Sequence, residues 1–566
     1  MKCSLKNALM ILLIIFMIGA MYLTINRNNS SGNSVDMPNG TPPAKPSEDS
    51  INNGDVRNGM PNLPDSLPPE MPSGTPPDMS NSENTSTITY VLLGTEALVI
   101  SITGVYLVLS KFNKKTFKET FEDKDKLIIG GLATIILTGG ITYLSTTFIK
   151  KSSNLPNMQG GPSGLSENSA NITYKASKEI TSDENITSGT FSSTNSLENA
   201  ISVSGKVSVN LKNVTVSKTG DADGGDSTSF YGNNSAVLAM NGATVTITNA
   251  TITTDASGAN GVFSYGGSAT TNNSNSDGTT INISDSKITT TGDNAGGIMT
   301  TGGGIMNANN LEINTSGRSS AAIRTDRGGG KVTVTNGTFK TTGVGSPSIY
   351  STADITVNDA TLISTASEGV VIEGANSVTL NNCTLTDTNN ELNGQSTTYK
   401  NIFLYQSMSG DAKEGGSTFT AKNSKITTNK GDSFYITNTT ATINLQNNEI
   451  INNDTTGYFL RSKTDSWGNS GSNGGNVTLN MTNQKASGDI YIDSISTLVM
   501  NMISSKYEGA INSDNTAKSI SLKLDSSSTI KLTGDSYVTS LEDSDTSYSN
   551  IDFNGYKLYV NGKAIN

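Results

Sequence analysis

The sequence predicts an all-β protein whose main part is a parallel β-helix of about a dozen coils. The first observation is a unit that returns, with changes, from about residue 199 to the end of the chain. Its period is roughly 22–26 residues where nothing is inserted, which is typical of solenoids. Three copies begin at Ser235 (SAVLAMNGATVTITNATITT), Ala321 (AAIRTDRGGGKVTVTNGTFKTT) and Gly369 (GVVIEGANSVTLNNCTLTDT).

The second observation is the composition of each unit. Each copy has three short strands rich in Val, Ile and Thr, in which apolar and polar residues alternate. One coil cannot bury its own apolar side chains, but stacked coils can, at about 4.8 Å per coil. A dozen coils would therefore form a rod of roughly 60 Å.

The third observation is that Gly or Asn recurs between the strands. Both residues tolerate the left-handed backbone of a tight turn. We expect the asparagines of the coil corners to stack as amide ladders. They are Asn213, Asn249, Asn336, Asn358, Asn382 and Asn447.

The chain before the β-helix divides into four segments. Residues 1–27 read as a signal anchor or a signal peptide, since two lysines precede an apolar run. Residues 28–86 form a Pro-, Asn- and Ser-rich linker that cannot build a core. Residues 87–151 hold two further apolar spans, 88–109 and 127–149, each long enough to cross a bilayer. A second linker, 152–171, leads to the β-helix of residues 172–566.

Charge predicts how these segments are oriented. The loop between the two spans carries six lysines, so the positive-inside rule places it in the cytoplasm. The β-helix is then extracytoplasmic, at the surface of a cell membrane. There is no LPxTG-type sorting signal at the C-terminal end, so the expected anchor is the N-terminal region.

Composition excludes several classes of function. The net charge is −11 and the sequence pI about 4.8, which disfavours nucleic acid as a partner. The chain has no histidine, which rules out Ser-His-Asp triads and the usual zinc hydrolase sites. The two cysteines, Cys3 and Cys383, are placed too far apart in the predicted organisation to form a disulfide.

Insertions between the strands indicate where function lies. Segments 219–234 and 389–400 precede the first strand of a coil, whereas 267–278, 407–416 and 463–475 follow it. Loops would therefore grow along both sides of the sheet built from first strands, and form the walls of a groove. Binding residues are often found on loops that a rigid scaffold holds in place.

Alternation predicts which side chains face that groove. If Ile323 points into the core, Arg324 and Asp326 point out, and other coils follow the same register. Stacking on aromatic rings and hydrogen bonding to charged groups would suit an extended polysaccharide. The alternative is that these side chains pack beneath the inserted loops. The candidate ligand-binding residues are Phe263, Tyr265, Met299, Arg324, Asp326, Arg327, Tyr350, Glu373, Tyr405, Tyr435, Arg461 and Tyr491.

The coil pattern of residues 180–566 resembles the pectin-lyase-like family of right-handed parallel β-helices. That family includes polysaccharide lyases, polygalacturonases, surface adhesins and carbohydrate-binding proteins. Its lyases use an Arg or Lys base beside calcium, which Arg324, Asp326, Arg327 and Glu373 could mimic, although no catalytic motif matches. The resemblance therefore implies a non-catalytic adhesin or carbohydrate-binding protein of the bacterial surface. The alternatives are a polysaccharide lyase or glycoside hydrolase, binding of ice or mineral through Thr-x-Thr ladders, and a purely structural stalk.

One loop suggests a metal ion. Asp221, Asp223 and Asp226 bring three carboxylates together, and calcium prefers such oxygen ligands. The loop lacks the EF-hand spacing, and the alternative is a solvated loop. We expect no other cofactor.

Overall fold

A computed structural model describes residues 172–222, 224–267, 276–394 and 396–566. Contacts within the chain divide it into two units between Met158 and Gln159, and the described residues belong to the second unit. The expected signal segment (1–27), the two linkers (28–86 and 152–171) and the two-span hairpin (87–151) lie outside the described residues. Within the described part, no helix combines the length and apolar character needed to cross a membrane.

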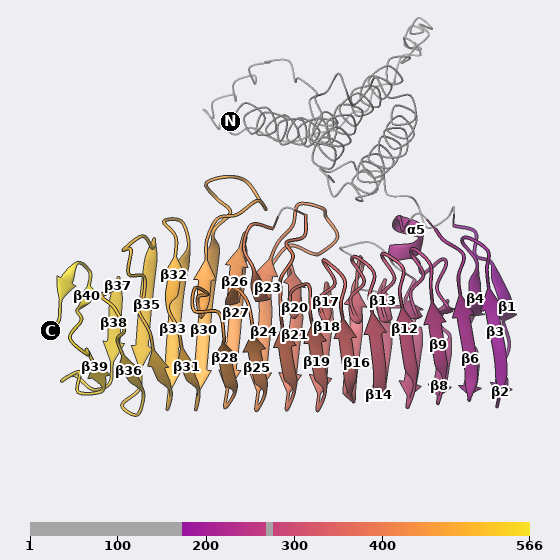
Figure 1. Cartoon of the computed structure of the whole chain (residues 1–566), viewed down its shortest axis with the longest axis horizontal. Helices are drawn as coiled ribbons and strands as arrows, with labels where there is room; N and C mark the ends of the chain where they lie inside the picture. Colours follow the sequence, from indigo (N-terminus) through magenta and orange to yellow (C-terminus); the bar gives the residue numbers. More distant parts are fainter. Residues whose placement is uncertain (1–171, 223, 268–275, 395) are drawn as a thin grey trace, which may run out of the picture. The chain divides into compact units, whose positions relative to one another are not determined.

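The described chain forms coils of three strands, and most strands pair in parallel with their counterparts in the next coil (Figure 1). The first strands form one 12-stranded parallel sheet, called here the first-strand sheet. It contains β1 (Ala176–Ile180), β4 (Asn199–Ser204), β7 (Val237–Met240), β10 (Val262–Tyr265), β13 (Ile298–Thr301), β15 (Ile323–Thr325), β17 (Ile349–Ser351), β20 (Val370–Glu373), β23 (Lys400–Tyr405), β26 (Asp432–Thr437), β29 (Leu460–Ser462) and β32 (Ile490–Ile492).

Second and third strands share a 22-stranded sheet, because β14 (Gly304–Thr315) and β16 (Gly330–Thr341) run through both rows. The second-strand row also contains β2 (Glu184–Ile186), β5 (Ser208–Lys212), β8 (Thr244–Thr248), β11 (Thr280–Ser284), β18 (Asp354–Asn358), β21 (Ser377–Asn381), β24 (Ser417–Lys422), β27 (Thr439–Gln446), β30 (Gly475–Thr482), β33 (Thr497–Ile503), β35 (Ser519–Leu524) and β38 (Ser540–Asp543).

The third-strand row begins in the 22-stranded sheet and ends in a separate 4-stranded one. Its first part contains β3 (Gly189–Ser193), β6 (Val214–Lys218), β9 (Thr251–Thr254), β12 (Lys287–Thr290), β19 (Thr361–Ser364), β22 (Thr384–Asp387), β25 (Lys425–Thr428) and β28 (Glu449–Asn452). Its last part contains β31 (Lys485–Ser487), β34 (Lys506–Glu508), β36 (Thr529–Lys531) and β39 (Ile551–Asp552).

The predicted three-strand coil is therefore confirmed, and so is its period. Ladder partners in adjacent coils lie 25 residues apart at Asn282 and Asn307, and 23 apart at Asn358 and Asn381. Alternation explains the packing. In β8, Val245 and Ile247 point into the core while the threonines point out. The Val, Ile and Leu side chains of successive coils thus form one continuous core along the stack.

The corner between second and third strands requires a left-handed residue. Asn213 (φ 52°) and Asn249 (φ 53°) adopt this conformation, and Asn249 Nδ2 donates to Asn213 Oδ1 over 2.7 Å. The expected amide pairing is therefore present between Asn213 and Asn249, whereas Asn382 donates to Asp359 and Asn447 to Asn423. Asn358 is a correction, because it ends strand β18, where Asn381 donates to it, and Asp359 (φ 54°) takes the corner.

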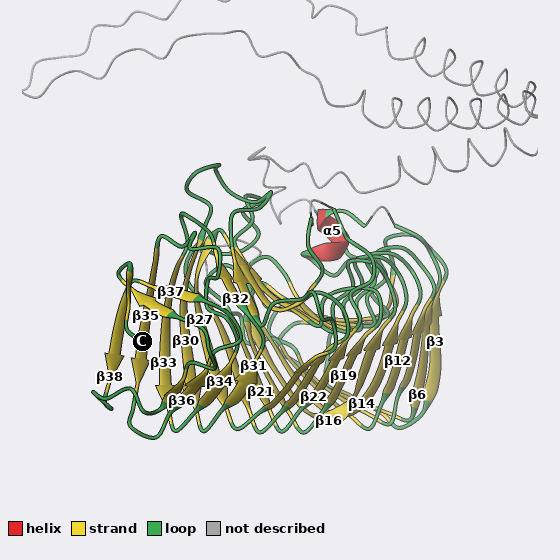
Figure 2. Cartoon of the chain, turned by 60° about the vertical axis from the view of Figure 1, so that its left-hand side comes forward, coloured by secondary structure: helices red, strands yellow, loops and turns green. Residues whose placement is uncertain are grey.

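The insertions occur where the sequence predicted them, before or after first strands, and they emerge along one side of the coils (Figures 1 and 2). The insertion before β7 contains the single helical turn α5 (Asp226–Ser229). At the C-terminal end, β37 (Ser536–Val538) pairs with β40 (Leu558–Val560), and β41 (Lys563–Ala564) folds back antiparallel on β40.

Candidate functional site

One line of outward side chains runs along the first-strand sheet, and the strand register defines it. Adjacent coils pair Phe263 with Met299, Met299 with Arg324, and Arg324 with Tyr350. The line continues through Val371, Phe403, Tyr435, Arg461 and Tyr491. We call it the outward column. The predicted register is correct, since Glu373, Tyr405 and Arg461 lie on the outward side. Phe403 lies on the same side, whereas Phe459 belongs to the core.

The N-terminal part of this face is covered by the insertion that contains α5. Phe230 and Tyr231 of that insertion pack on first-strand side chains in a cluster separate from the main core. The Thr301 hydroxyl donates to the carbonyl of Phe230 over 2.7 Å. A Cβ atom on Gly232 would lie 2.7 Å from atoms of Leu238 and Phe263, so the loop rests directly on the sheet. The cluster comprises Phe230, Tyr231, Leu238, Met240, Phe263, Tyr265 and Met299.

Charged groups join two insertions over the middle of the sheet. Arg327 reaches Asp411 of one insertion (2.6 Å) and Asp226 of the other (3.6 Å), and its guanidinium lies 3.9 Å from the centre of the Phe230 ring. Beside it, Arg324 pairs with Asp326 over 2.9 Å. Burial raises the pKa of Asp326 to about 6, although Arg324 acts in the opposite direction.

A second aromatic cluster follows. Phe403 stacks on Tyr405 at 4.4 Å, and Trp467 of the insertion after β29 contacts both rings at 5.1 and 5.4 Å. Beneath them, Tyr350 and Tyr405 donate to the Glu373 carboxylate over 2.5 and 3.0 Å. Burial raises the pKa of Glu373, and the hydrogen bonds from Ser407, Tyr350 and Tyr405 oppose that shift.

Lys400 lies at the start of β23, with its side chain fully buried. Its Nζ lies 4.5 Å from the centre of the Phe403 ring and 5.1 Å from that of Tyr435. It donates to the Thr398 carbonyl over 2.9 Å and lies 3.5 Å from the Glu368 carboxylate. Burial lowers its pKa. These contacts fix the insertion before β23 onto the cluster.

The groove predicted along the first-strand sheet is therefore filled over its N-terminal and middle parts, as the loop-packing alternative expects. The insertions before β7 and after β29 do not stand up as walls; they place Phe230, Tyr231 and Trp467 on first-strand side chains. Buried among the predicted groove residues are Phe263, Tyr265, Met299, Asp326, Glu373, Tyr405 and Tyr435. Half-buried are Arg324, Arg327, Tyr350, Arg461 and Tyr491.

The C-terminal end of the outward column is different. The connection after β32 is short, and Tyr491 stays half-buried. Arg461 lies between two rings, 4.1 Å from the centre of Tyr458 and 5.8 Å from that of Tyr491, and its guanidinium binds Asp432 over 2.6 and 3.1 Å. Arg461 is thereby held rigidly with a partly open face.

Two further tyrosines lie beyond the first-strand sheet, in the 3-stranded sheet at the C-terminal end. Tyr537 and Tyr559 are register partners on β37 and β40, and their half-buried rings stack at 4.6 Å with an interplanar angle of 4°. We use the name open aromatic end for Tyr458, Arg461, Tyr491, Tyr537 and Tyr559.

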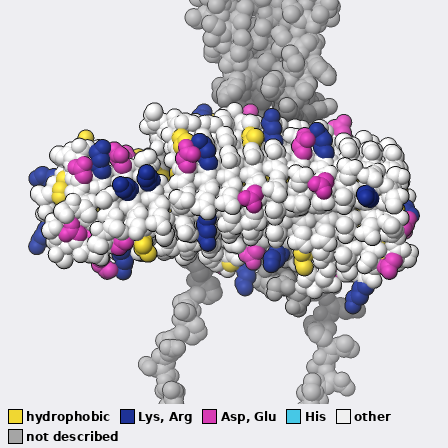
Figure 3. Space-filling model, turned by 90° about the horizontal axis from the view of Figure 1, so that it is seen from below, with side chains coloured by type: hydrophobic (Ala, Val, Ile, Leu, Met, Phe, Trp, Pro, Cys, Tyr) yellow, Lys and Arg dark blue, Asp and Glu magenta, His cyan; other side chains and the backbone are white. Residues whose placement is uncertain are grey.

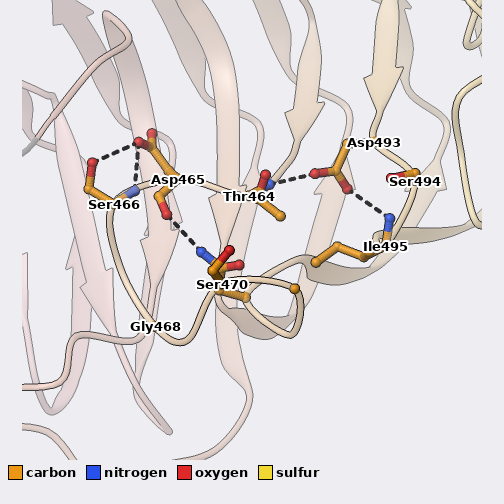
Figure 4. A pocket seen from close by; sticks show the side chains of 10 residues that line it. Thr464, Asp465, Ser466, Gly468, Ser470, Asp493, Ser494 and Ile495 are labelled. Atoms are coloured by element: carbon orange, nitrogen blue, oxygen red, sulfur yellow. Dashed lines mark hydrogen bonds between the residues drawn. The ribbon is translucent and has the colours of Figure 1, made fainter. Parts of the chain in front are cut away.

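A polar recess of about 520 Å³ borders the open aromatic end, where the insertion after β29 faces the turn after β32 (Figure 4). Asp493 accepts the backbone N–H of Thr464 over 2.7 Å, and Asn473 Nδ2 donates to the Asp465 carbonyl over 2.7 Å. Burial acts to raise the pKa of Asp493, but hydrogen bonds from Ser496, Thr464 and Ile495 outweigh it and lower the pKa. The recess thus presents carboxylate, hydroxyl and amide groups in fixed positions.

The calcium site was predicted from three aspartates, and one of them, Asp223, lies outside the described residues. Of the other two, Asp221 accepts the N–H of Ser257 over 2.8 Å and Asp226 lies 3.6 Å from Arg327. Across the described ranges, no group of three or more Asp, Glu, His or Cys side chains is arranged to hold a metal.

Sequence reasoning missed Trp467, Lys400, Tyr537 and Tyr559. Trp467 is the sole tryptophan of the chain, and it falls within a predicted insertion, so it could have been found as a cover for the sheet. Tyr537 is the middle residue of a Ser-x-Val pattern and Tyr559 that of a Leu-x-Val pattern, in short strands near the end of the chain. Lys400 gave no signal, because an isolated lysine at a strand start reads as solvent-exposed.

Comparison with known proteins gives no relative. No family model matches the chain, and neither a curated protein nor a solved structure is detectably similar to it.

Proposed function

We propose that this protein is a non-catalytic β-helix of the bacterial cell surface that binds a polysaccharide along the open aromatic end. The observation that carries the proposal is the contrast along the outward column. Aromatic side chains are covered over most of the column, but Tyr491 at its end, and Tyr537 and Tyr559 in the separate sheet that follows, are half-buried. Half-buried rings in successive parts of the stack suit an extended chain of sugars, whose apolar ring faces stack on aromatic rings.

The polar recess supports the same proposal. Sugar hydroxyls donate and accept hydrogen bonds, and the recess offers carboxylate, hydroxyl and amide groups beside the rings. These groups are held by backbone hydrogen bonds at Asp493 and Asn473, so little conformational freedom is lost on binding.

The proposal includes the location. Apolar residues 8–25, 88–109 and 127–149 would anchor the chain in the cell membrane and display a right-handed β-helix outside it. Nucleic acid is not an expected partner, because the chain carries a net charge of −11.

The test is a polysaccharide array with the full-length chain and three variants. Tyr491→Ala and Tyr537→Ala remove rings from the open aromatic end. Tyr556→Ala is the matched control, because Tyr556 is 39% exposed and lies in the turn before β40, outside the column. We expect the first two to weaken binding about tenfold, equivalent to about 1.4 kcal/mol, and the control to bind normally.

Two outcomes contradict the proposal. Equal loss in the Tyr556→Ala control would show that the column does not bind the glycan. Release of reducing ends or of unsaturated products, assayed alongside binding, would establish the alternative function of a hydrolase or lyase.

A further inference from the structure

The third-strand row is interrupted between β28 and β31. The second strands of the same two coils, β27 and β30, pair along their whole length, yet the following third strands belong to different sheets. At the break, the Gln484 side chain takes the place of a backbone pair. Its Nε2 donates to the Asn448 carbonyl and its Oε1 accepts the Asn448 N–H, both over 2.9 Å. A recess of about 760 Å³ opens beside this side-chain bridge.

Charge pairing fails at the same place. Elsewhere in the outward line of the third-strand row, lysine meets glutamate in the next coil, as in Lys287–Glu312 (2.7 Å) and Lys425–Glu449 (3.0 Å). At the recess, two lysines, Lys485 and Lys506, are register partners.

Neither lysine forms a salt bridge: within the described ranges, no carboxylate lies within 4.0 Å of Lys485 or Lys506. Glu449, Glu508 and Asp552 also line the recess, with Lys531. Glu449 pairs with Lys425, and Glu508 pairs with Lys531 over 2.8 Å. Like charges directly opposite on neighbouring strands destabilise a sheet unless an anion lies between them. Basic and acidic side chains are interspersed along the face that Figure 3 shows, including its C-terminal end.

We propose that this recess is a second binding site, specific for an acidic saccharide whose carboxylate bridges Lys485 and Lys506. The volume is that of a site for a few sugar units. Ser487, Thr529 and Asn550 line it and supply hydroxyl and amide groups for sugar hydroxyls, and Ile450 supplies an apolar wall. An acidic peptide would share the charge, but Gln484 already occupies the backbone groups at Asn448 where an added strand would begin to pair.

The experiment uses the full-length chain and alginate oligosaccharides, whose uronate units carry one carboxylate each. Binding is measured by calorimetry at low and high salt. The double variant Lys485→Ala/Lys506→Ala is compared with Lys287→Ala, which removes a lysine of the same line whose partner, Glu312, does not line the recess. We expect the double variant to lose at least about tenfold in affinity, and Lys287→Ala and Tyr491→Ala to bind as the unaltered chain does. The Tyr491→Ala result separates this site from the open aromatic end.

The following outcomes would overturn the inference. Absence of alginate binding, or equal binding of carboxyl-reduced alginate, shows that no carboxylate is recognised. Equal loss in Lys287→Ala would show that the effect comes from general surface charge. Tighter binding of polyglutamate than of alginate assigns the recess to an acidic peptide.

Discussion

Asp387 carries an acid group at a position that hydroxyl side chains fill in neighbouring coils. The register places it in line with Thr341, Ser364 and Thr428 at the end of the third strands. It is fully buried, and neither of its carboxylate oxygens receives a hydrogen bond. Burial raises its pKa well above the ordinary value, and the nearby Glu368 adds to the shift.

We therefore expect Asp387 to lower the stability of the fold in a pH-dependent way. Because the folded chain holds the proton more tightly than the unfolded chain, Asp387 destabilises the fold increasingly as pH rises above about 4, up to its raised pKa. Asp387→Asn has no charge to bury. We expect it to raise the free energy of unfolding at pH 7 by about 1–3 kcal/mol and to have little effect near pH 3. Urea unfolding at a series of pH values measures this.

Asp454→Asn is the control, because its effect on the free energy of unfolding should have the opposite sign at pH 7. Hydrogen bonds from Gly431 and Thr456 lower the pKa of Asp454, so its contribution is present at neutral pH and is lost as pH falls through that lowered pKa. Its variant should be less stable at pH 7 and equal to the parent in strong acid. If the free energies of unfolding of the parent and of Asp387→Asn changed with pH in the same way, the raised pKa assigned to Asp387 would be wrong.

At the scale of elements, the coils and the insertions are held by different forces. Coils are joined by parallel backbone pairing and a continuous apolar core. The insertions carry few backbone pairs and rely on side chains, chiefly Arg327, which joins the loops of Asp226 and Asp411.

Arg327→Ala should therefore loosen both loops and leave the coils intact. Hydrogen bonds of charged groups contribute about 1.5–3 kcal/mol, so we expect at least about tenfold faster amide exchange in segments 224–234 and 407–416. Arg318→Ala is the matched control, since Arg318 binds Asn393 of a different insertion (2.9 Å) and should loosen that one alone. Uniform acceleration across the strands in Arg327→Ala would show that the residue supports the whole fold.

The corner of the coils at Gly317 and Gly343 depends on close contact between the backbones of adjacent coils. A Cβ atom on Gly317 would lie 1.8 Å from the carbonyl oxygen of Gly292 in the preceding coil, and one on Gly343 would lie 1.8 Å from that of Gly317. Glycine is required here for space.

Gly317→Ala must push adjacent coils apart, and overpacking of this kind costs about 1–3 kcal/mol. In Gly416→Ala the new Cβ would lie 3.4 Å from its nearest neighbour, so that variant should keep the parent stability. Thermal unfolding of both variants tests the difference. Equal unfolding midpoints for Gly317→Ala and Gly416→Ala would show that space does not require glycine at position 317.

At the scale of the molecule, the repeat predicted most of the fold, because alternation and corner residues are local and recur in every coil. The outward register followed from one assumption about Ile323. The site could not be predicted equally well. Whether a loop stands beside a sheet or lies across it depends on contacts distant in sequence, such as Trp467 with Phe403 and Lys400 with Tyr435.

The end of the stack gives the last prediction. The last coil of a β-helix leaves an unpaired edge that can pair with another chain, and β41 covers the edge of β40 by running antiparallel to it. Deleting residues 554–566 removes this cover and the fully buried Leu558, and it exposes the edge of β37. We expect a loss of about 2–5 kcal/mol and self-association through the exposed edge. Sedimentation velocity of the truncated and intact chains measures association.

Ala564→Ser, which keeps the hairpin and changes an exposed side chain, should behave as the intact chain does. A truncated chain that matched the intact one in association state and unfolding midpoint would show that the hairpin is not needed to end the stack.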